Sequence, residues 1–218
     1  IKGPLSAARR YISATGNLSY GYIGGGDSDP TTVDRIDYSS DTDAAVVKGS
    51  LPYEVYGNGA TGDANYGYTI GGFNTTPGSN NWLTTVTRID YSNDSASPSP
   101  KGPITQARRL KSTGSTSYGW SGGGSTTAHA ATSTIDRIDY SNDTATAVVK
   151  GPLSGTRTNL YAASSQANSL GSETVYPWYD TSGKGDDGNN SSGGARYGSG
   201  GGGAFTFDGT SNYVSLDD

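Results

Sequence analysis

The sequence has no cysteine, no methionine and a single histidine among its 218 residues. Zero cysteine excludes disulfides and thiol chemistry, although it leaves the cellular compartment open. One histidine without cysteine cannot supply a His/Cys metal cluster or a Cys–His catalytic pair. We therefore expect no metal site and no cofactor of these kinds.

Long basic runs and long apolar runs are also missing. The formal net charge is −5 and the pI is near 4.7, whereas phosphate binding requires a basic stripe, so no nucleic-acid partner is expected. There is no apolar stretch of about 18 residues and no signal-peptide pattern, so no membrane insertion is expected. A start at Ile1 within a repeated phrase, with no methionine anywhere, predicts that the chain is a piece of a longer polypeptide.

Large aliphatic side chains are scarce as well. Leu, Ile, Val and Phe together make up about 14% of the chain, a level typical of disordered segments when the net charge is also high. Here the charge is small, and 34 glycines and 16 tyrosines stand where aliphatics are missing. Tyrosine and glycine at regular places favour tightly packed strands and turns.

What the sequence does contain is a repeat. Aligned on a Lys-Gly pair, the units start near Lys2, Lys48, Lys101 and Lys150, with periods of 46, 53 and 49 residues. A period near 50 with several short strand signals is typical of a propeller blade, because solenoid repeats are usually shorter or helical.

Each unit predicts a four-stranded antiparallel blade, and the chain an all-β fold. "DRIDYS" reads as a strand, "SNDT" as a turn and "AAVVKG" as a second strand. The other half of the unit ends in a glycine doublet, as in "YGYIGGG" from Tyr20, where backbones approach closely. No helical periodicity appears.

The Arg-x-Asp of each "RID" strand recurs in every unit, at Arg35, Arg88 and Arg137. One interpretation is a ring of charges lining a channel. The favoured one is a ladder of inter-strand ion pairs, because a feature present in every unit is more often structural.

A strand ending in a glycine doublet, a variable loop, a strand "RIDYS", a second strand and then "GPLSAARR" resembles the kelch motif. The resemblance covers about residues 1–164 and implies kelch-like blades. The tryptophan that normally closes the kelch hairpin is absent, with Val47 or Val149 near its place, and the second unit has "LPYEVY" where the first has "PLSAARR". More narrowly, "RIDYSNDTATAVVKGPLS" with "YGYIGGG" resembles tandem repeats of marine and cyanobacterial phage structural proteins.

Three glycine-doublet units are fewer than the four to eight blades of an ordinary propeller. Either further blades precede Ile1 or subunits complete one another, and the sequence leaves both open. The phrase recurs because identical strands meet identical neighbours around a ring or along an array.

Candidate binding residues are sought where the repeat is broken. Insertions collect in one loop per unit, between the glycine doublet and the "RID" strand, and equivalent propeller loops emerge on the same face. An aromatic flanked by amides suits stacking on a sugar with hydrogen bonds to its hydroxyls; packing within the blade or between subunits is the favoured alternative. His129 reads as an ordinary loop residue. The candidates are Phe73, Asn80, Asn81, Trp82 and His129.

The repeat stops after about residue 164. Residues 165–177 read as a polar linker, and residues 178–218 resemble the start of a laminin-G or concanavalin-like jelly roll, truncated after about forty residues. The motifs that carry this resemblance are "WYDTSGKGDDG" and "FDGTSNYV", from Trp178 and Phe207. Phe205 and Phe207 on one side of "DGTSN", and Tyr213 and Val214 on the other, predict a hairpin. The acidic residues near Asp180 read as a turn, in preference to a Ca²⁺ loop.

The sequence offers few combinations of residues that could catalyse a reaction, and we expect no catalytic residues and no enzyme activity. A Ser-His-Asp triad would have to use His129, and no G-x-S-x-G elbow exists. The two glutamates, Glu54 and Glu173, are far apart, and no aspartate pair stands out from the repeat positions as a glycosidase pair would.

Taken together, the sequence predicts a structural, non-enzymatic virion protein: a phage tail-fibre or tail-tip segment that binds host surface glycans or a receptor through variable blade loops. Other virion or tail proteins would be partners, and fibre resemblance implies a homo-oligomer, a trimer. The expected location is the virion tail, or otherwise the extracellular space or cell surface. The alternative is a bacterial surface adhesin or extracellular matrix protein built from the same modules.

Overall fold

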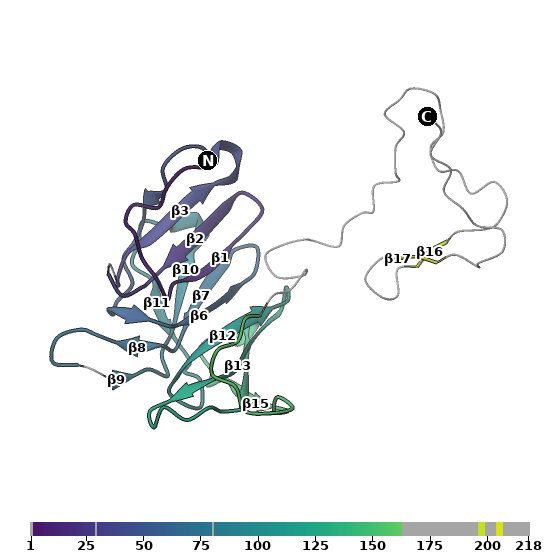
Figure 1. Cartoon of the computed structure of the whole chain (residues 1–218). Coiled ribbons are helices and arrows are strands. Elements are labelled where there is room, and N and C mark those ends of the chain that lie inside the picture. Colours follow the sequence, from purple (N-terminus) through teal and green to yellow (C-terminus); the bar gives the residue numbers. More distant parts are fainter. Residues whose placement is uncertain (1, 29, 80, 163–195, 199–203, 207–218) are drawn as a thin grey trace. The chain divides into compact units, whose positions relative to one another are not determined.

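A computed structural model describes residues 2–28, 30–79, 81–162, 196–198 and 204–206 (Figure 1). The chain divides into two compact units, Ile1–Gly171 and Ser172–Asp218. In the second unit the described residues are two short paired strands, β16 (Arg196–Gly198) and β17 (Ala204–Thr206). Phe205 lies on a strand, as predicted. That strand pairs with β16, where Phe205 is opposite Tyr197. Phe207, Tyr213 and Val214 lie outside the described residues, as do Trp178, Asp180 and the predicted linker.

The first unit contains three four-stranded antiparallel sheets, one for each predicted repeat. The first sheet comprises β1 (Ser13–Gly16), β2 (Tyr20–Gly24), β3 (Val33–Asp37) and β4 (Val46–Val47). The second comprises β6 (Gly59–Gly62), β7 (Tyr66–Ile70), β10 (Val86–Asp90) and β11 (Ser99–Lys101). The third comprises β12 (Arg108–Gly114), β13 (Tyr118–Thr126), β14 (Ile135–Asp139) and β15 (Val148–Lys150). In the first and third sheets consecutive strands are neighbours, as in a meander, whereas in the second β7 pairs with β10 and a hairpin that belongs to another sheet lies between them in the chain.

The predicted hairpin at each "RIDYS" phrase is confirmed, and a short 3-10 turn joins its strands. These turns are η1 (Tyr38–Ser40), η2 (Tyr91–Asn93) and η3 (Tyr140–Asn142). The aspartate that ends each "RID" strand caps the turn: Asp37 Oδ1 accepts hydrogen bonds from the backbone N–H (2.9 Å) and hydroxyl (2.6 Å) of Ser39. Asp90 and Asp139 do the same. The hydrogen bond from Ser39 is the largest cause of the lowered Asp37 pKa.

The favoured interpretation of the "RID" charges as structural ion pairs holds for Arg35 and Arg88, but their partners are Asp94 and Asp143 of the next sheet and not residues of a neighbouring strand in the same sheet. Arg35 lies over the ring of Tyr20 on the adjacent strand, 4.3 Å from its centroid. Its guanidinium donates to Asp94 of the second sheet at 2.8 Å. Charge pairing here links successive sheets, while the strand's own aspartate caps the turn.

The glycine doublets occupy backbone that other residues adopt with difficulty. Gly71 and Gly72 have φ angles of +59° and +100°, and a Cβ on Gly71 would lie 2.7 Å from the Arg108 carbonyl oxygen of the third sheet. Left-handed backbone and this close approach both require glycine. The doublet therefore allows one sheet to contact the next.

The long insertion in the second unit forms regular structure. Strands β8 (Phe73–Asn74) and β9 (Asn81–Trp82) pair as a hairpin, and β8 also pairs with β5 (Val55–Tyr56). This three-stranded sheet includes Val55 and Tyr56, the end of the "LPYEVY" segment that departs from the repeat, so the two departures in the second unit meet in one sheet.

Two small apolar clusters lie in the first unit. One contains Tyr22, Val33, Leu51, Val55, Leu83 and Ile89, and the other Tyr68, Ile70, Val86, Ile104, Leu110, Ile138 and Ala147. Each cluster draws residues from two successive repeats. Apolar burial therefore holds neighbouring sheets together despite the low aliphatic content.

Candidate binding face: a row of aromatic residues

Phe73 and Trp82 come together because their strands pair directly. They are opposite each other in the β8–β9 register, with ring centroids 5.5 Å apart in an edge-to-face arrangement. Both side chains are partly buried. Asn81 is exposed and lies opposite Asn74, while Asn80 lies outside the described residues.

His129 joins this pair from the variable loop of the third repeat. Its ring lies 5.5 Å from that of Trp82, at an interplanar angle of 74°. The loop is held by a hydrogen bond from the His129 N–H to the Thr126 carbonyl oxygen at 2.8 Å. Three of the five candidate residues, contributed by two different loops, are thus in one cluster.

Two tyrosines that the sequence analysis missed extend the cluster. The Tyr56 ring lies 5.7 Å from Phe73, and the Tyr11 ring lies 5.8 Å from Tyr56. We call the five residues the aromatic row: Tyr11, Tyr56, Phe73, Trp82 and His129. Tyr56 occupies the repeat position of Arg10 and Arg109, and this break in the pattern could have identified it.

Two arginines accompany the row. The Arg109 guanidinium lies 5.2 Å from the Trp82 ring centroid and 5.7 Å from that of Tyr56. Arg10 lies 5.4 Å from the Tyr11 ring and forms an exposed ion pair with Asp27, which raises the pKa of Arg10 and lowers that of Asp27. Guanidinium groups within about 6 Å of aromatic faces interact with the ring quadrupole. The row therefore combines ring faces with cationic hydrogen-bond donors.

The ends of the row have unusual backbone conformations. Tyr11 and His129 have φ angles of +59° and +57°, and among the described residues they are the non-glycine positions with positive φ. Tyr11 is 55% exposed, and His129 is also exposed. Such conformations cost about 1–3 kcal/mol each and persist only where the surroundings impose them; they cluster at binding and active sites.

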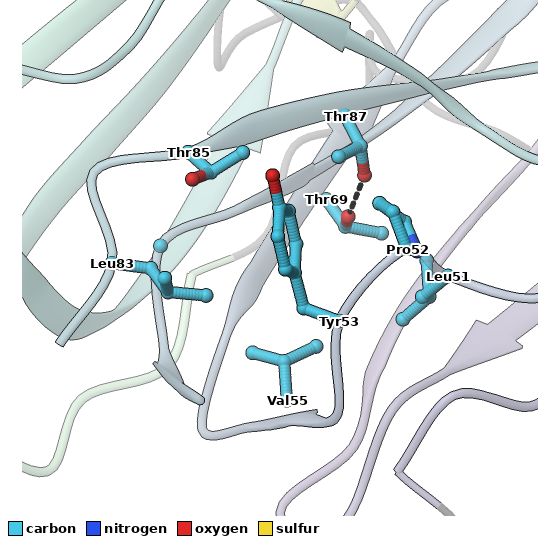
Figure 2. A pocket seen from close by; sticks show the side chains of 9 residues that line it. Leu51, Pro52, Tyr53, Val55, Thr69, Leu83, Thr85 and Thr87 are labelled. Carbon is cyan, nitrogen blue, oxygen red and sulfur yellow. Dashed lines mark hydrogen bonds between the residues drawn. The ribbon is translucent and has the colours of Figure 1, made fainter. Parts of the chain in front are cut away.

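Two cavities in the described part of the chain are lined by residues other than those of the aromatic row. Figure 2 shows a pocket in which the Tyr53 side chain extends between Leu83 and Thr85 on one side and Leu51 and Pro52 on the other. The free space corresponds to about one water molecule. A second hollow, along Leu18 to Tyr20 and Asp37 to Ser39, is an open surface depression.

Besides the guanidinium donors, the end of the row at Arg10 also carries a carboxylate. It belongs to Asp27 and is paired with Arg10. Within the described ranges no group of three or more His, Cys, Asp or Glu side chains is arranged to hold a metal ion, and no helix is long and apolar enough to cross a membrane.

The described residues define an all-β protein made of antiparallel sheets. Among solved structures, that of YjhT is similar to it, with a TM-score of 0.56 at 13% identity over 70% of this chain and 54% of that chain. The chain thus spans about half the length of that structure, and at this identity the likeness concerns the fold alone. No family model and no curated protein matches the sequence.

Proposed function

We propose that this chain is a structural, non-enzymatic segment of a phage tail fibre or tail tip that binds host surface glycans through the aromatic row. Its sheets would be kelch-like blades, and residues 178–218 the start of a jelly-roll domain. The repeat phrase supports the phage assignment by resemblance. The observation that carries the binding function is the aromatic row, because it is built from the segments that break the repeat.

The chemistry of the row suits a carbohydrate. Sugar rings present C–H faces that pack on aromatic rings, and their hydroxyls accept hydrogen bonds from donors such as Arg10 and Arg109. Asn81 is exposed, but it precedes Trp82 on β9 and its side chain therefore lies on the opposite face of the strand, outside the row. One such contact is weak, but repeated copies on a fibre increase the apparent affinity by effective concentration.

Binding to intact host cells before and after periodate oxidation of their surface glycans tests the proposal. We expect periodate-sensitive binding that weakens about tenfold in Trp82→Ala, an effect of the size expected for truncating a central aromatic anchor. Trp82→Phe should retain part of it. Tyr161→Ala is the matched control, because Tyr161 is 93% exposed and outside the row.

Unchanged binding by Trp82→Ala, or binding that survives periodate, would contradict the glycan function. The alternative of a bacterial surface adhesin would share the row and its ligand class. It is distinguished by the sequence upstream of Ile1: a signal peptide or anchor indicates an adhesin, and a baseplate-attachment domain a fibre.

A further inference from the structure

Successive sheets are joined by one recurring contact. The Asp94 carboxylate, in the turn of the second sheet, accepts hydrogen bonds from the Tyr22 hydroxyl at 2.9 Å and the Arg35 guanidinium at 2.8 Å. Lys48 Nζ lies 3.1 Å from its other oxygen, and the Gly49 N–H donates to the Asp94 carbonyl at 2.9 Å. Four groups of the first sheet and its exit strand thus converge on one aspartate.

The tyrosine of the same turn completes the contact. Tyr91 stacks on Tyr22 with centroids 4.7 Å apart and planes 12° apart. Its hydroxyl lies 3.0 Å from Thr15 Oγ1. We call Tyr91 and Asp94 the turn half of the contact. The receiving half is Thr15, Tyr22, Arg35, Lys48 and Gly49.

The contact between the second and third sheets repeats these pairings. Asp143 accepts from Tyr68 at 3.0 Å and from Arg88 at 2.8 Å, and Lys101 lies 3.3 Å from its second oxygen. Tyr140 stacks on Tyr68 at 4.9 Å, and its hydroxyl lies 2.7 Å from Thr61. Two occurrences in one chain show that the pairing is a property of the repeat.

The third sheet carries the equivalent receiving half, with Trp120 in place of the tyrosine, and the described residues place no turn against it. Its members are Thr113, Trp120, Arg137, Lys150 and Gly151. Trp120 is opposite Arg137 in the β13–β14 register, as Tyr22 is opposite Arg35. Within the described part of the chain, neither Arg137 nor Lys150 has a carboxylate partner.

Two further observations mark this face as lacking its partner. Thr113 Oγ1 is buried and has no hydrogen-bond partner among the described residues, whereas Thr15 and Thr61 bond the tyrosine of the next turn. A Cβ on Gly151 would meet nothing within 4 Å, whereas one on Gly49 or Gly102 would lie 2.0 Å or 1.9 Å from a carbonyl oxygen of the next turn. A buried unsatisfied hydroxyl normally has an explanation.

The first sheet carries the complementary turn half. Tyr38 is 53% exposed, in contrast to the partly buried Tyr91 and Tyr140. The Asp41 side chain is 44% exposed and forms an ion pair with Lys2 at 2.9 Å. Among the described residues it has no arginine or tyrosine partner of the kind that Asp94 and Asp143 have.

We propose that the receiving half of the third sheet binds the Tyr38–Asp41 turn of a second copy of this chain. In this contact Tyr38 stacks on Trp120, while Asp41 accepts from Arg137. The segment that starts at Lys150 repeats "KGPLS" from Lys2, so Lys150 and Gly151 can take the places that Lys2 and Gly3 occupy around the partner's Asp41 turn.

Exchange of identical segments between copies is a low-cost route to assembly. The exchange conserves the lysine and backbone contacts and adds those of Arg137 and Trp120. The resulting contact is heterologous, since two different faces meet, and it closes into a ring or extends as a chain according to the rotation between copies. This inference does not depend on the glycan function, because the aromatic row takes no part in it.

Reversing the charge at position 41 or at position 137 tests the proposed contact between copies. The purified 218-residue chain should self-associate in sedimentation equilibrium. Asp41→Arg alone and Arg137→Asp alone should each weaken association at least about tenfold, because each places like charges opposite each other. Mixing the two variants should restore association in a 1:1 ratio, since every contact then pairs Arg with Asp.

Arg10→Glu, which changes an exposed charge next to the aromatic row and outside the proposed contact, serves as the control and should associate like the unchanged chain. Circular dichroism and thermal unfolding establish that the variants are folded. A chain that stays monomeric at all accessible concentrations overturns the proposal. Association that persists in both single variants, or that mixing fails to restore, also overturns it, since the contact would then lie elsewhere.

Discussion

The carboxylate of Asp94 shows how a chain with few aliphatic residues stabilises its packing. Burial alone would raise its pKa, but hydrogen bonds from Tyr22, Lys48 and Arg35 outweigh that effect, and the pKa is lowered. The same burial raises the pKa of Tyr22, so its hydroxyl remains a donor at neutral pH. The group is therefore ionised and fully partnered when the chain is folded. We expect Asp94→Asn to lower the free energy of unfolding by about 3 kcal/mol at pH 7, because the change leaves Arg35 and Lys48 without the negative charge that pairs with them. A carboxylate with a depressed folded pKa contributes stability that is present above its unfolded pKa, about 3.9, and is lost as the pH falls through the lower folded value. The difference in unfolding free energy between variant and unchanged chain, measured by urea unfolding, should thus shrink below about pH 4.

The control is Asp43→Asn, because Asp43 is exposed and accepts from the Ser40 hydroxyl at 2.6 Å; this variant should have little effect. An Asp94→Asn difference that stays constant down to pH 2.5 would contradict the assignment.

At the scale of the strand, a buried ion pair in the first and third sheets joins the start of the sheet to its third strand. Arg108 and Asp136 form a fully buried ion pair at 2.8 Å, and Arg108 also donates to the carbonyl oxygens of Ser121 and Gly123. Arg9 and Asp34 repeat this pair in the first sheet. In the second sheet the equivalent positions are Val55 and Thr87, both charges having been replaced together.

This paired replacement predicts strong coupling between Arg108 and Asp136. Either Arg108→Val or Asp136→Thr alone should cost about 3–5 kcal/mol, because each leaves one uncompensated buried charge. The double variant should cost clearly less than the sum, because it copies the arrangement of the second sheet, where Thr87 bonds Thr69 at 2.6 Å. Urea unfolding of all four chains measures the coupling. Strict additivity would show that the two charges act independently. Some loss should remain in the double variant, since in the second sheet Tyr53 extends between these positions and a small void is still left (Figure 2).

The elements that the sequence predicted are those whose signals are local. The "RIDYS" hairpin follows from period-two alternation and an adjacent turn, and Phe73 and Trp82 stood out because they break the repeat. The missed features depend on contacts distant in sequence. The partner of Arg35 lies 59 residues away in the next sheet, which alternation along one strand cannot reveal. Tyr11 joins the aromatic row only because β5 and β8 bring Tyr56 between it and Phe73.

Across the whole first unit, the three sheets are connected in series by contacts that are polar as well as apolar. Asp94 and Asp143 occupy equivalent positions, one at each junction. The stability of such an array is approximately the sum of the stabilities of its units and of the interfaces between neighbours. A substitution at one junction should therefore destabilise mainly the two sheets that it joins. Lys111 is an exception, since its Nζ lies 3.3 Å from the Ile12 carbonyl oxygen and 3.4 Å from that of Asn58, so it links the third sheet to both of the others.

Hydrogen exchange on Asp143→Asn and Asp94→Asn distinguishes serial coupling from a single cooperative unit. In Asp143→Asn the third sheet, residues 108–150, should exchange faster while the first sheet, residues 13–47, keeps its protection. Asp94→Asn should show the reverse order, because the first sheet then loses the aspartate that holds it to the second. The two variants are matched controls for each other, since each removes one oxygen acceptor from the same kind of contact. Uniform acceleration over all three sheets in both variants would mean that Lys111 and the apolar clusters couple the unit so tightly that it opens as a whole.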